Sequence, residues 1–138
     1  MNRLEGIHPL IIDRLRNEYH FTDEEILEVL SYFEKRSIKR KEFILRAGEV
    51  CRGRGYINKG CFRRYTTNDH GKEVTIDFAF EDWWIGDRES IRKHECSIYF
   101  LQAMEDCEVF WIDQETYERL CQDVPKFHVT QVKKMESS

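Results

Sequence analysis

The spacing of hydrophobic residues changes along the chain. In roughly the first third, apolar residues recur every three or four positions, which predicts two amphipathic helices. Pro9 is a good first-turn residue for the first helix. Thr22 and Glu25 have the spacing of a capping box, in which the hydroxyl and the carboxylate bind the free amides of a helix start. The second helix therefore begins after Thr22 and continues to about Phe33.

From Ser37 the period becomes two, which predicts short strands at 43–45, 56–57, 61–67, 74–80, 98–103 and 107–112. The loop 68–71 indicates a hairpin between two of them. Val74, Ile76, Phe78 and Phe80 alternate with polar or small residues, so that strand is expected to have one apolar face. Strands every 8–12 residues with turns between them are typical of an all-β barrel or roll.

After Ile112 the pattern turns helical again. Asp113 is placed to cap a short helix, and Asp123 to Pro125 ends it and starts another. The fold prediction is mainly β with flanking helices, in the form of a jelly roll. Residues 1–124 are expected to form the roll with its N-terminal helices, and residues 125–138 the start of a C-terminal helix.

The composition of the chain argues against several classes of function. Of the 138 residues, 41% are hydrophobic and 35% charged, and the net charge of −4 gives no electrostatic footprint for DNA. No apolar run approaches the ~18 residues of a membrane span, so a cytoplasmic protein is expected. The five cysteines form no Cys-x-x-Cys pair, and no two histidines are closer than 12 residues apart. We expect no metal, no cofactor and no enzymatic activity. A cupin-like metal enzyme stays open only if the purified protein contains a metal.

Several motifs occur in one order, and together they resemble one family. The chain is similar to the effector-sensing domain of Crp/Fnr bacterial transcription regulators from about Glu24 to Phe127, and residues 81–87 resemble a branch common in the Bacteroidetes. The motifs are Arg46–Glu49, Gly60 with the strand after it, Asp69–Glu73, Trp84–Asp87 and Ala103–Glu108. The resemblance implies a jelly roll, with Trp84 packed inside it and Trp83 nearer the surface.

The resemblance also locates a ligand site. In members that bind cyclic AMP, a Gly-Glu pair faces the phosphate and ribose, and Gly86 and Asp87 occupy that pair here. An arginine eleven residues after the glycine neutralises the phosphate, but this chain has Ser97 followed by Ile98. A charge-assisted bond to a buried anion is worth ~1.5–3 kcal/mol, so losing it weakens binding about 10- to 150-fold. The usual mode of binding cyclic AMP is therefore not expected.

Arg64 is the best candidate to replace the missing cation, because the family pattern puts it with Phe62 on the strand face that lines the pocket. Ile76 would line the same pocket from the next strand. Arg88 and Arg92 could also turn inward from a short helix after Gly86. The candidate ligand-binding residues are thus Arg64, Ile76, Gly86, Asp87, Ser97 and Ile98.

Two hypotheses of different classes follow. The first is a small-molecule sensor domain that forms a homodimer through the helix after Pro125 and reaches DNA only through a helix-turn-helix domain that this chain lacks. The second is a ligand-free roll that acts through protein contacts, its pocket filled by the bulky side chains of Phe62, Ile98, Tyr99 and Phe100.

Overall fold

A computed structural model describes residues 3–137, with the side chains of residues 3–131. The chain forms two compact units. One contains the two ends of the chain, up to Glu34 and from Ile112, and the other is Lys35–Trp111. Within the described part, no helix combines the length and the apolar character needed to cross a bilayer.

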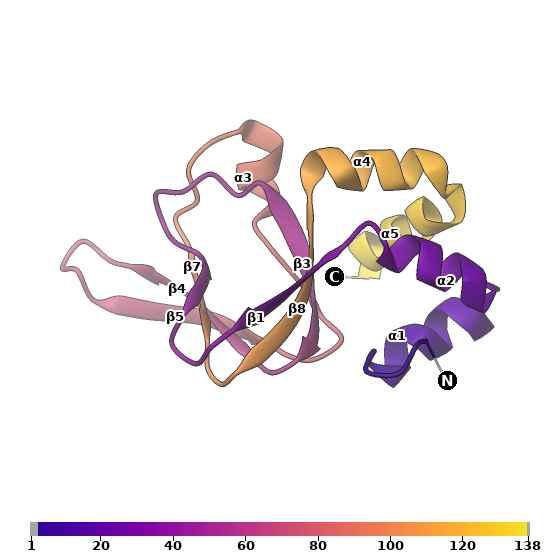
Figure 1. Cartoon of the computed structure of the whole chain (residues 1–138). Coiled ribbons are helices and arrows are strands. Elements are labelled where there is room, and N and C mark those ends of the chain that lie inside the picture. Colours follow the sequence, from indigo (N-terminus) through magenta and orange to yellow (C-terminus); the bar gives the residue numbers. More distant parts are fainter. Residues whose placement is uncertain (1–2, 138) are drawn as a thin grey trace. The chain divides into compact units, whose positions relative to one another are not determined.

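The first unit is helical. Its elements are α1 (Pro9–Asp13), a π-helical turn η1 (Arg14–Glu18), α2 (Asp23–Leu30), α4 (Gln114–Asp123) and α5 (Pro125–Ser137) (Figure 1). The predicted capping box is confirmed: Thr22 Oγ1 accepts from Glu25 N at 3.1 Å, and Thr22 N donates to Glu25 Oε1 at 2.9 Å. The Asp113 cap is also confirmed, because Asp113 Oδ1 accepts from Thr116 N at 2.8 Å.

Aromatic contacts join the early and late helices of this unit. Phe127 is 3% exposed, and its ring meets Phe33 and Tyr117 edge-on at centroid distances of 6.3 and 6.4 Å. At the surface, Lys126 Nζ donates to Glu25 Oε1 at 3.0 Å. The start of α5 is thus fixed to the capped start of α2 inside one core.

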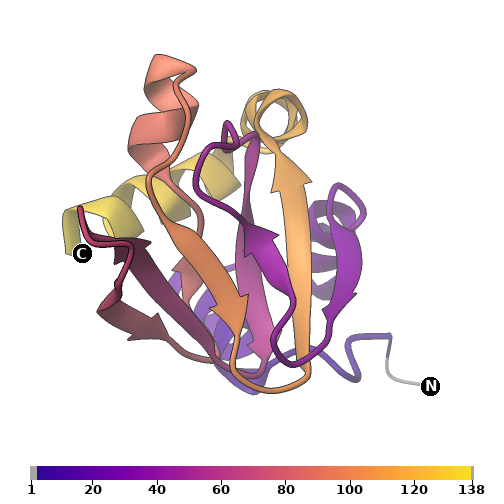
Figure 2. The same ribbon diagram turned by 90° about the vertical axis from the view of Figure 1, so that its left-hand side faces the viewer.

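The second unit is the roll. The chain has eight strands in its described part, arranged in two four-stranded sheets with orders β1-β8-β3-β6 and β2-β7-β4-β5. Figures 1 and 2 show the strands, with the helix α3 (Arg88–Lys93) at one end of the roll. The strands are β1 (Glu34–Ile38), β2 (Phe43–Leu45), β3 (Gly53–Lys59), β4 (Phe62–Thr67), β5 (Glu73–Ala79), β6 (Trp84–Ile85), β7 (Phe100–Ala103) and β8 (Cys107–Asp113). The prediction of a mainly β jelly roll with flanking helices is confirmed, although the sequence did not indicate β1 or β6.

Both sheets contribute to one core. Phe62, Ile57 and Val109 are fully buried in a cluster with other apolar side chains of both sheets. Gly55 is required by this packing, since a Cβ at that position would lie 2.5 Å from Val109 Cγ1. Trp84 packs edge-on against Tyr56 at 5.4 Å, whereas Trp83 is 47% exposed, as the family pattern implied.

The prediction of one packed apolar face on β5 is wrong. Thr75 pairs with Tyr65 and Asp77 with Arg64, so Ile76 is an extra residue at a β-bulge. The bulge reverses the alternation, because Val74 then shares a face with Thr66 while Phe78 shares the opposite face with Arg63. Val74, Ile76, Phe78 and Phe80 are all 40–49% exposed. An even spacing of apolar residues cannot reveal a bulge, since the bulge depends on the partner strand.

Candidate functional site

The segment that carries Gly86 lies tightly against β3. Gly86 has a φ of 152°, and a Cβ there would come 3.1 Å from the Gly53 carbonyl oxygen and 3.5 Å from Arg54 Cα. Backbone atoms cannot move aside cheaply, so only glycine fits this approach. The glycine therefore has a structural reason to be there, whether or not a ligand binds.

Asp87 caps α3 and uses both carboxylate oxygens within the protein. Its Oδ1 accepts from Ser90 N at 3.2 Å, which satisfies a free amide in the first turn of the helix. Its Oδ2 accepts from Ser97 Oγ at 2.6 Å. The carboxylate that the family pattern assigns to a ribose hydroxyl is thus occupied by a serine hydroxyl.

Ser97 is held equally firmly. It is 3% exposed, and its hydroxyl also accepts from Tyr99 N at 3.1 Å. Its backbone N–H donates to Glu49 O at 2.8 Å, and its carbonyl accepts from Gly48 N at 2.8 Å. Position 97, where members that bind cyclic AMP have the phosphate-binding arginine, is therefore hydrogen-bonded on both sides to the loop that starts at Arg46.

Ser90 and Cys51 complete this set of bonds. The Ser90 hydroxyl donates to Glu95 O at 2.6 Å and accepts from Cys51 N at 2.8 Å, while Asp87 N donates to Cys51 Sγ at 3.4 Å. We call Cys51, Asp87, Ser90 and Ser97 the α3 network. It joins three segments of the roll. Ser90 was not among the predicted site residues, although its spacing of three from Asp87 is that of a helix cap and the amide it binds.

Arg64 lies on β4, and its contacts are with residues outside the α3 network. Its Nε and Nη2 donate to the Asp77 carboxylate at 3.0 and 2.7 Å, and its guanidinium lies 5.1 Å from the Tyr99 ring centroid. Arg64 pairs across the sheet with Leu101, which is buried, and alternation along β4 puts it on the same face as Phe62. The predicted orientation of Arg64 thus agrees with the register, but its charge is already neutralised by Asp77.

The six candidate residues fall into two groups. Gly86, Asp87 and Ser97 come together in the α3 segment, while Arg64 and Ile76 belong to the β4–β5 hairpin. Ile98 is 62% exposed, and its carbonyl accepts from Thr66 Oγ1 at 2.9 Å. Tyr99 links the groups, since its amide binds Ser97 and its ring lies over Arg64.

Two of the thiols, those of Cys61 and Cys107, are not activated as nucleophiles. Burial raises the pKa of Cys107 and of Cys61, which favours the neutral thiol. Cys51 and Cys107 are buried, and all five cysteines are free. Among the described residues, no three His, Cys, Asp or Glu side chains are grouped in a way that could hold a metal ion.

Comparisons with known proteins bear on the family and the fold of the chain. Residues 35–124 match the family model described as cyclic nucleotide-binding domain. That stretch covers the whole roll and α4. A match to a binding domain accords with the prediction that the chain is not an enzyme. A search of curated proteins gives no match.

Solved structures show the same fold. The catabolite activator protein of Thermus thermophilus superposes with a TM-score of 0.69 at 20% identity, over 85% of this chain and 56% of that one. The sensor domain of the transcriptional regulator DNR from Pseudomonas aeruginosa gives 0.66 at 17%, over 93% and 88%. The CO-dependent transcription factor CooA from Carboxydothermus hydrogenoformans gives 0.63 at 19%, over 97% and 54%. This chain thus spans only about half the length of two of these regulators.

Proposed function

Since this chain belongs to the cyclic nucleotide-binding domain family, we propose that it is the effector-sensing part of a Crp/Fnr-type bacterial transcription regulator. Its effector would be a small molecule, and cyclic AMP would not bind in the usual way. The Bacteroidetes branch of the family, suggested by residues 81–87, is part of the same proposal. Neighbours with this fold include a catabolite activator and a CO-dependent factor, so the fold serves more than one signal.

One observation carries the proposal on cyclic AMP: the Ser97 hydroxyl donates to the Asp87 carboxylate at 2.6 Å. The side chains at the two positions that would contact the phosphate and the ribose are thus hydrogen-bonded to each other. A cyclic nucleotide would have to break that bond and bury its phosphate without a facing cation, which costs more than losing one charge-assisted bond. Arg64 can supply a cation only by giving up part of its bidentate pair with Asp77.

An anionic effector is the chemistry that Arg64 favours. The Arg64–Asp77 pair is partly exposed, with side-chain accessibilities of 34% and 47%, so solvent already screens it and its disruption costs little. A carboxylate or phosphate could replace Asp77 at the guanidinium with similar bidentate geometry. Tyr99, which touches both groups of site residues, would then transmit occupancy to the α3 network.

Signal transmission would use the last helix. We propose that α5 is the start of a dimerisation helix and that a ligand shifts the balance between two arrangements of it. The regulator would act as a homodimer and contact DNA through a separate helix-turn-helix domain. Lys126 binds Glu25 of α2, and Phe127 packs against Phe33, so the start of α5 is held in place while the later part of the helix would change its arrangement.

The second candidate is a ligand-free module that acts through protein contacts. The α3 network favours it, because a site whose polar groups are satisfied internally needs no ligand to fold. Phe62 supports the same reading, since it is 0% exposed and fills the centre of the roll. Phe100 does not fill a pocket, because it stacks on Tyr65 at 4.8 Å, on the opposite face of β4 from Phe62.

The experiment is a thermal-shift and calorimetric titration with cyclic AMP, cyclic GMP and a panel of small carboxylates and phosphates. A ligand at 100 times its dissociation constant should stabilise the fold by about 2.7 kcal/mol. We expect no response to cyclic nucleotides and a response to an anion that disappears in Arg64→Ala. Tight binding of cyclic AMP by the wild type would refute the first point. No response to any ligand would favour the ligand-free module.

Two gain-of-function variants distinguish two reasons why cyclic AMP would not bind: a missing positive charge, or a site closed by its own hydrogen bonds. Ser97→Arg restores the family cation but disturbs a buried position, whereas Ile98→Arg places the charge on a neighbour that is 62% exposed. If only the charge is missing, cyclic AMP binding should strengthen about 10- to 150-fold in at least one of them. If neither variant that still folds gains binding, the α3 network itself closes the site.

A further inference from the structure

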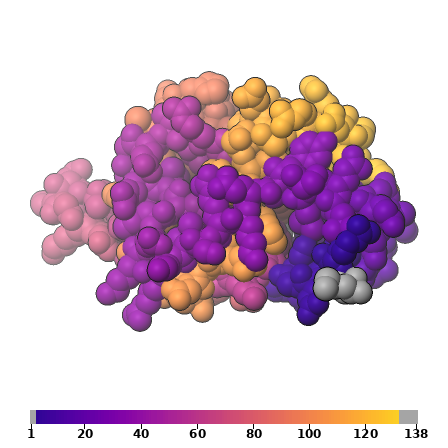
Figure 3. Space-filling model, in the orientation of Figure 1, coloured from indigo at the N-terminus to yellow at the C-terminus, as the bar shows by residue number. Residues whose placement is uncertain are grey.

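The helical unit contains a pocket that the proposed function does not use. Its volume of about 340 Å³ falls within the range of small-molecule sites. The pocket is lined by apolar side chains (Leu4, Ile7, Pro9 and Ile12) and by polar ones (Glu5, Asp13, Arg16 and Asn17). We call it the N-terminal pocket. It lies near the start of the described chain, which Figure 3 shows in indigo at the surface.

One wall of the pocket is helical. Pro9, the pair Ile12–Asp13 and the pair Arg16–Asn17 follow each other at intervals of three or four residues, so they share one face of α1 and η1. Asn17 Nδ2 donates to Asp13 Oδ1 at 2.6 Å, which holds both side chains on that face. The turn η1 is π-helical, and such turns are frequent at functional sites. This wall thus presents a carboxylate and an amide at fixed positions.

The other wall is the segment 4–7. Ile7 N donates to Leu4 O at 3.3 Å, which closes a turn, and Leu4 is only 5% exposed, so a buried side chain anchors the segment. Arg16 Nε and Nη2 donate to the Asp23 carboxylate at 2.8 and 3.0 Å and tie η1 to the start of α2. Both walls are therefore held without a ligand, and a preformed site loses less entropy on binding.

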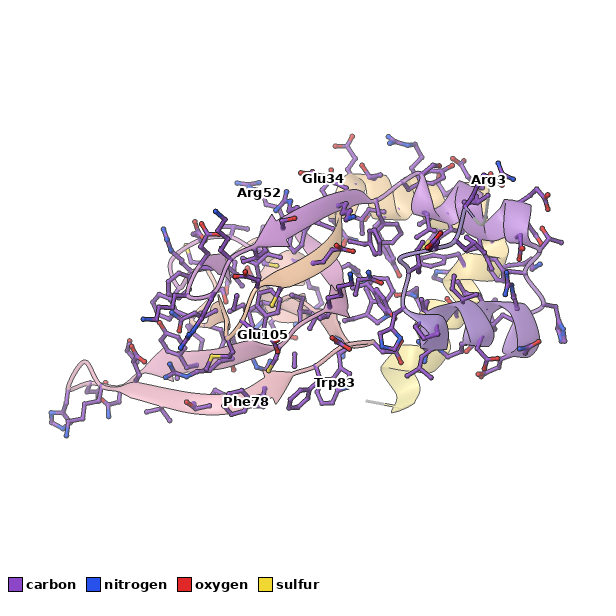
Figure 4. All side chains as sticks on the ribbon, turned by 60° about the horizontal axis from the view of Figure 1, so that its bottom comes forward. Arg3, Glu34, Arg52, Phe78, Trp83 and Glu105 are labelled. Carbon is purple, nitrogen blue, oxygen red and sulfur yellow. The ribbon has the colours of Figure 1, made fainter. Side chains whose placement is uncertain are left out.

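The charge that remains in the pocket is negative. In the described part of the chain, Arg16 is the only basic residue of the lining, and it is paired with Asp23. The hydrogen bond from Arg16 lowers the pKa of Asp23, and the charge of Arg3, labelled in Figure 4, acts in the same direction. These cations thus act on Asp23. Glu5 and Asp13, one on each wall, attract a cation from solvent.

We propose that the N-terminal pocket binds a small organic amine. The ammonium group pairs with Glu5 and Asp13, and the aliphatic or aromatic part lies against the apolar lining. An inorganic cation would gain nothing from that lining, and a carboxylic acid would meet two carboxylates. This site differs in chemistry from the anion site proposed at Arg64 and does not depend on it.

The first test is a calorimetric titration of the whole chain with hexylammonium, hexanol and hexanoate. At low salt, hexylammonium should bind about three- to tenfold more tightly than hexanol, since exposed ion pairs contribute little each, and hexanoate should bind most weakly. Propylammonium should bind more weakly than hexylammonium, by up to about fourfold for each missing methylene. Equal affinities for hexylammonium and hexanol, or for the propyl and hexyl amines, would overturn the proposal.

The second test removes one carboxylate. Asp13→Asn keeps an oxygen that can accept from Asn17, so it should weaken hexylammonium binding about two- to fivefold and leave hexanol binding unchanged. Glu18→Gln is the matched control, because Glu18 is an exposed carboxylate of η1 outside the pocket lining, and it should change neither affinity. If Asp13→Asn melts below the wild type, Glu5→Gln on the other wall replaces it with the same expectation. Equal weakening by the pocket variant and the control would show a mere effect of net charge and would refute the site.

Amide chemical shifts locate the bound amine. Hexylammonium should shift the signals of residues 4–17, and the shifts should saturate with the affinity found by calorimetry. Arg64→Ala, which tests the anionic effector, should leave this binding unchanged. Shifts confined to the roll, shifts that do not saturate, or loss of binding in Arg64→Ala would each contradict an amine site in the N-terminal pocket.

Discussion

The α3 network and the β4–β5 hairpin were both candidates for the same ligand site, yet they are built in different ways. In the α3 network, Ser97 is 3% exposed, and Asp87 binds Ser90 and Ser97 with its two oxygens. In the hairpin, Arg64 and Asp77 form a good bidentate pair that solvent reaches. Buried hydrogen bonds are costly to break, whereas exposed ion pairs contribute little. We therefore interpret the first region as part of the scaffold, and we expect a ligand to gain its binding energy from the second.

The largest expected effect on the free energy of unfolding tests whether the exposed side of β5 belongs to the core. Phe62 and Phe78 lie on neighbouring strands, but Phe62 is fully buried and Phe78 is 40% exposed. Phe62→Ala should lower the free energy of unfolding by about 3–5 kcal/mol, because it leaves a cavity between the sheets. Phe78→Ala should cost less than about 1 kcal/mol in the monomer. Denaturant unfolding at low protein concentration measures both. Equal losses would mean that β5 belongs to the core.

The next effect compares the contributions of the Asp87 and Asp77 carboxylates to stability. Asp87→Ala removes a helix cap and leaves the buried Ser97 hydroxyl without its acceptor, so we expect a loss of about 2–4 kcal/mol. Asp77→Ala removes an exposed ion pair and should cost at most about 1 kcal/mol. Chemical denaturation gives both values. A loss near 1 kcal/mol for Asp87→Ala would mean that the network is not cooperative.

Thiol labelling provides an independent readout of Asp87→Ala. Cys51 is 3% exposed and Cys96 is exposed, so Cys96 should label first in the wild type. If Asp87 holds the segment closed, its removal should speed the labelling of Cys51 and leave the rate of Cys96 unchanged. Unchanged labelling of Cys51 would place the stabilising effect elsewhere.

The smallest effect concerns the second helix cap of the same type. The Thr116 amide, which donates to Asp113, holds the pKa of Asp113 below its ordinary value of 3.8. A lowered folded-state pKa adds stability above the unfolded-state value, and this stability is lost as the pH falls through the folded-state pKa. Asp113→Asn cannot ionise, so its difference from the wild type should shrink as the pH falls below 3.8.

The expected size is no more than about 0.5 kcal/mol at neutral pH, because the carboxylate is exposed to solvent. Unfolding curves between pH 7 and pH 2.5 would measure it. Asp113 differs from Asp87 in that it is exposed and is bonded by Thr116, whereas Asp87 binds the buried Ser97 hydroxyl. A difference that stays constant with pH would show that the charge of Asp113 contributes nothing beyond the hydrogen bond.

Local patterns in the sequence predicted most of the elements. The capping box at Thr22, the Asp113 cap and the loop after Thr67 were readable because each depends on residues within one turn of one another. The alternation from Ser37 onward predicted the roll, and the order of motifs indicated a domain of the cyclic nucleotide-binding type, whose family model matches residues 35–124. Only a short β1 and a two-residue β6 lacked enough pattern to be noticed.

The tertiary structure decided what those elements do together. The sequence named Asp87 and Ser97 as ligand contacts, but only the fold brings their side chains to 2.6 Å and makes them partners of each other. It predicted the orientation of Arg64 but not its pairing with Asp77, and it could not reveal the bulge at Ile76. Caps and periodicities depend on neighbours in the chain, whereas satisfied polar groups and strand register depend on residues far away. The sequence alone therefore determined the kind of domain, and the packing of distant segments determined which site residues are already occupied.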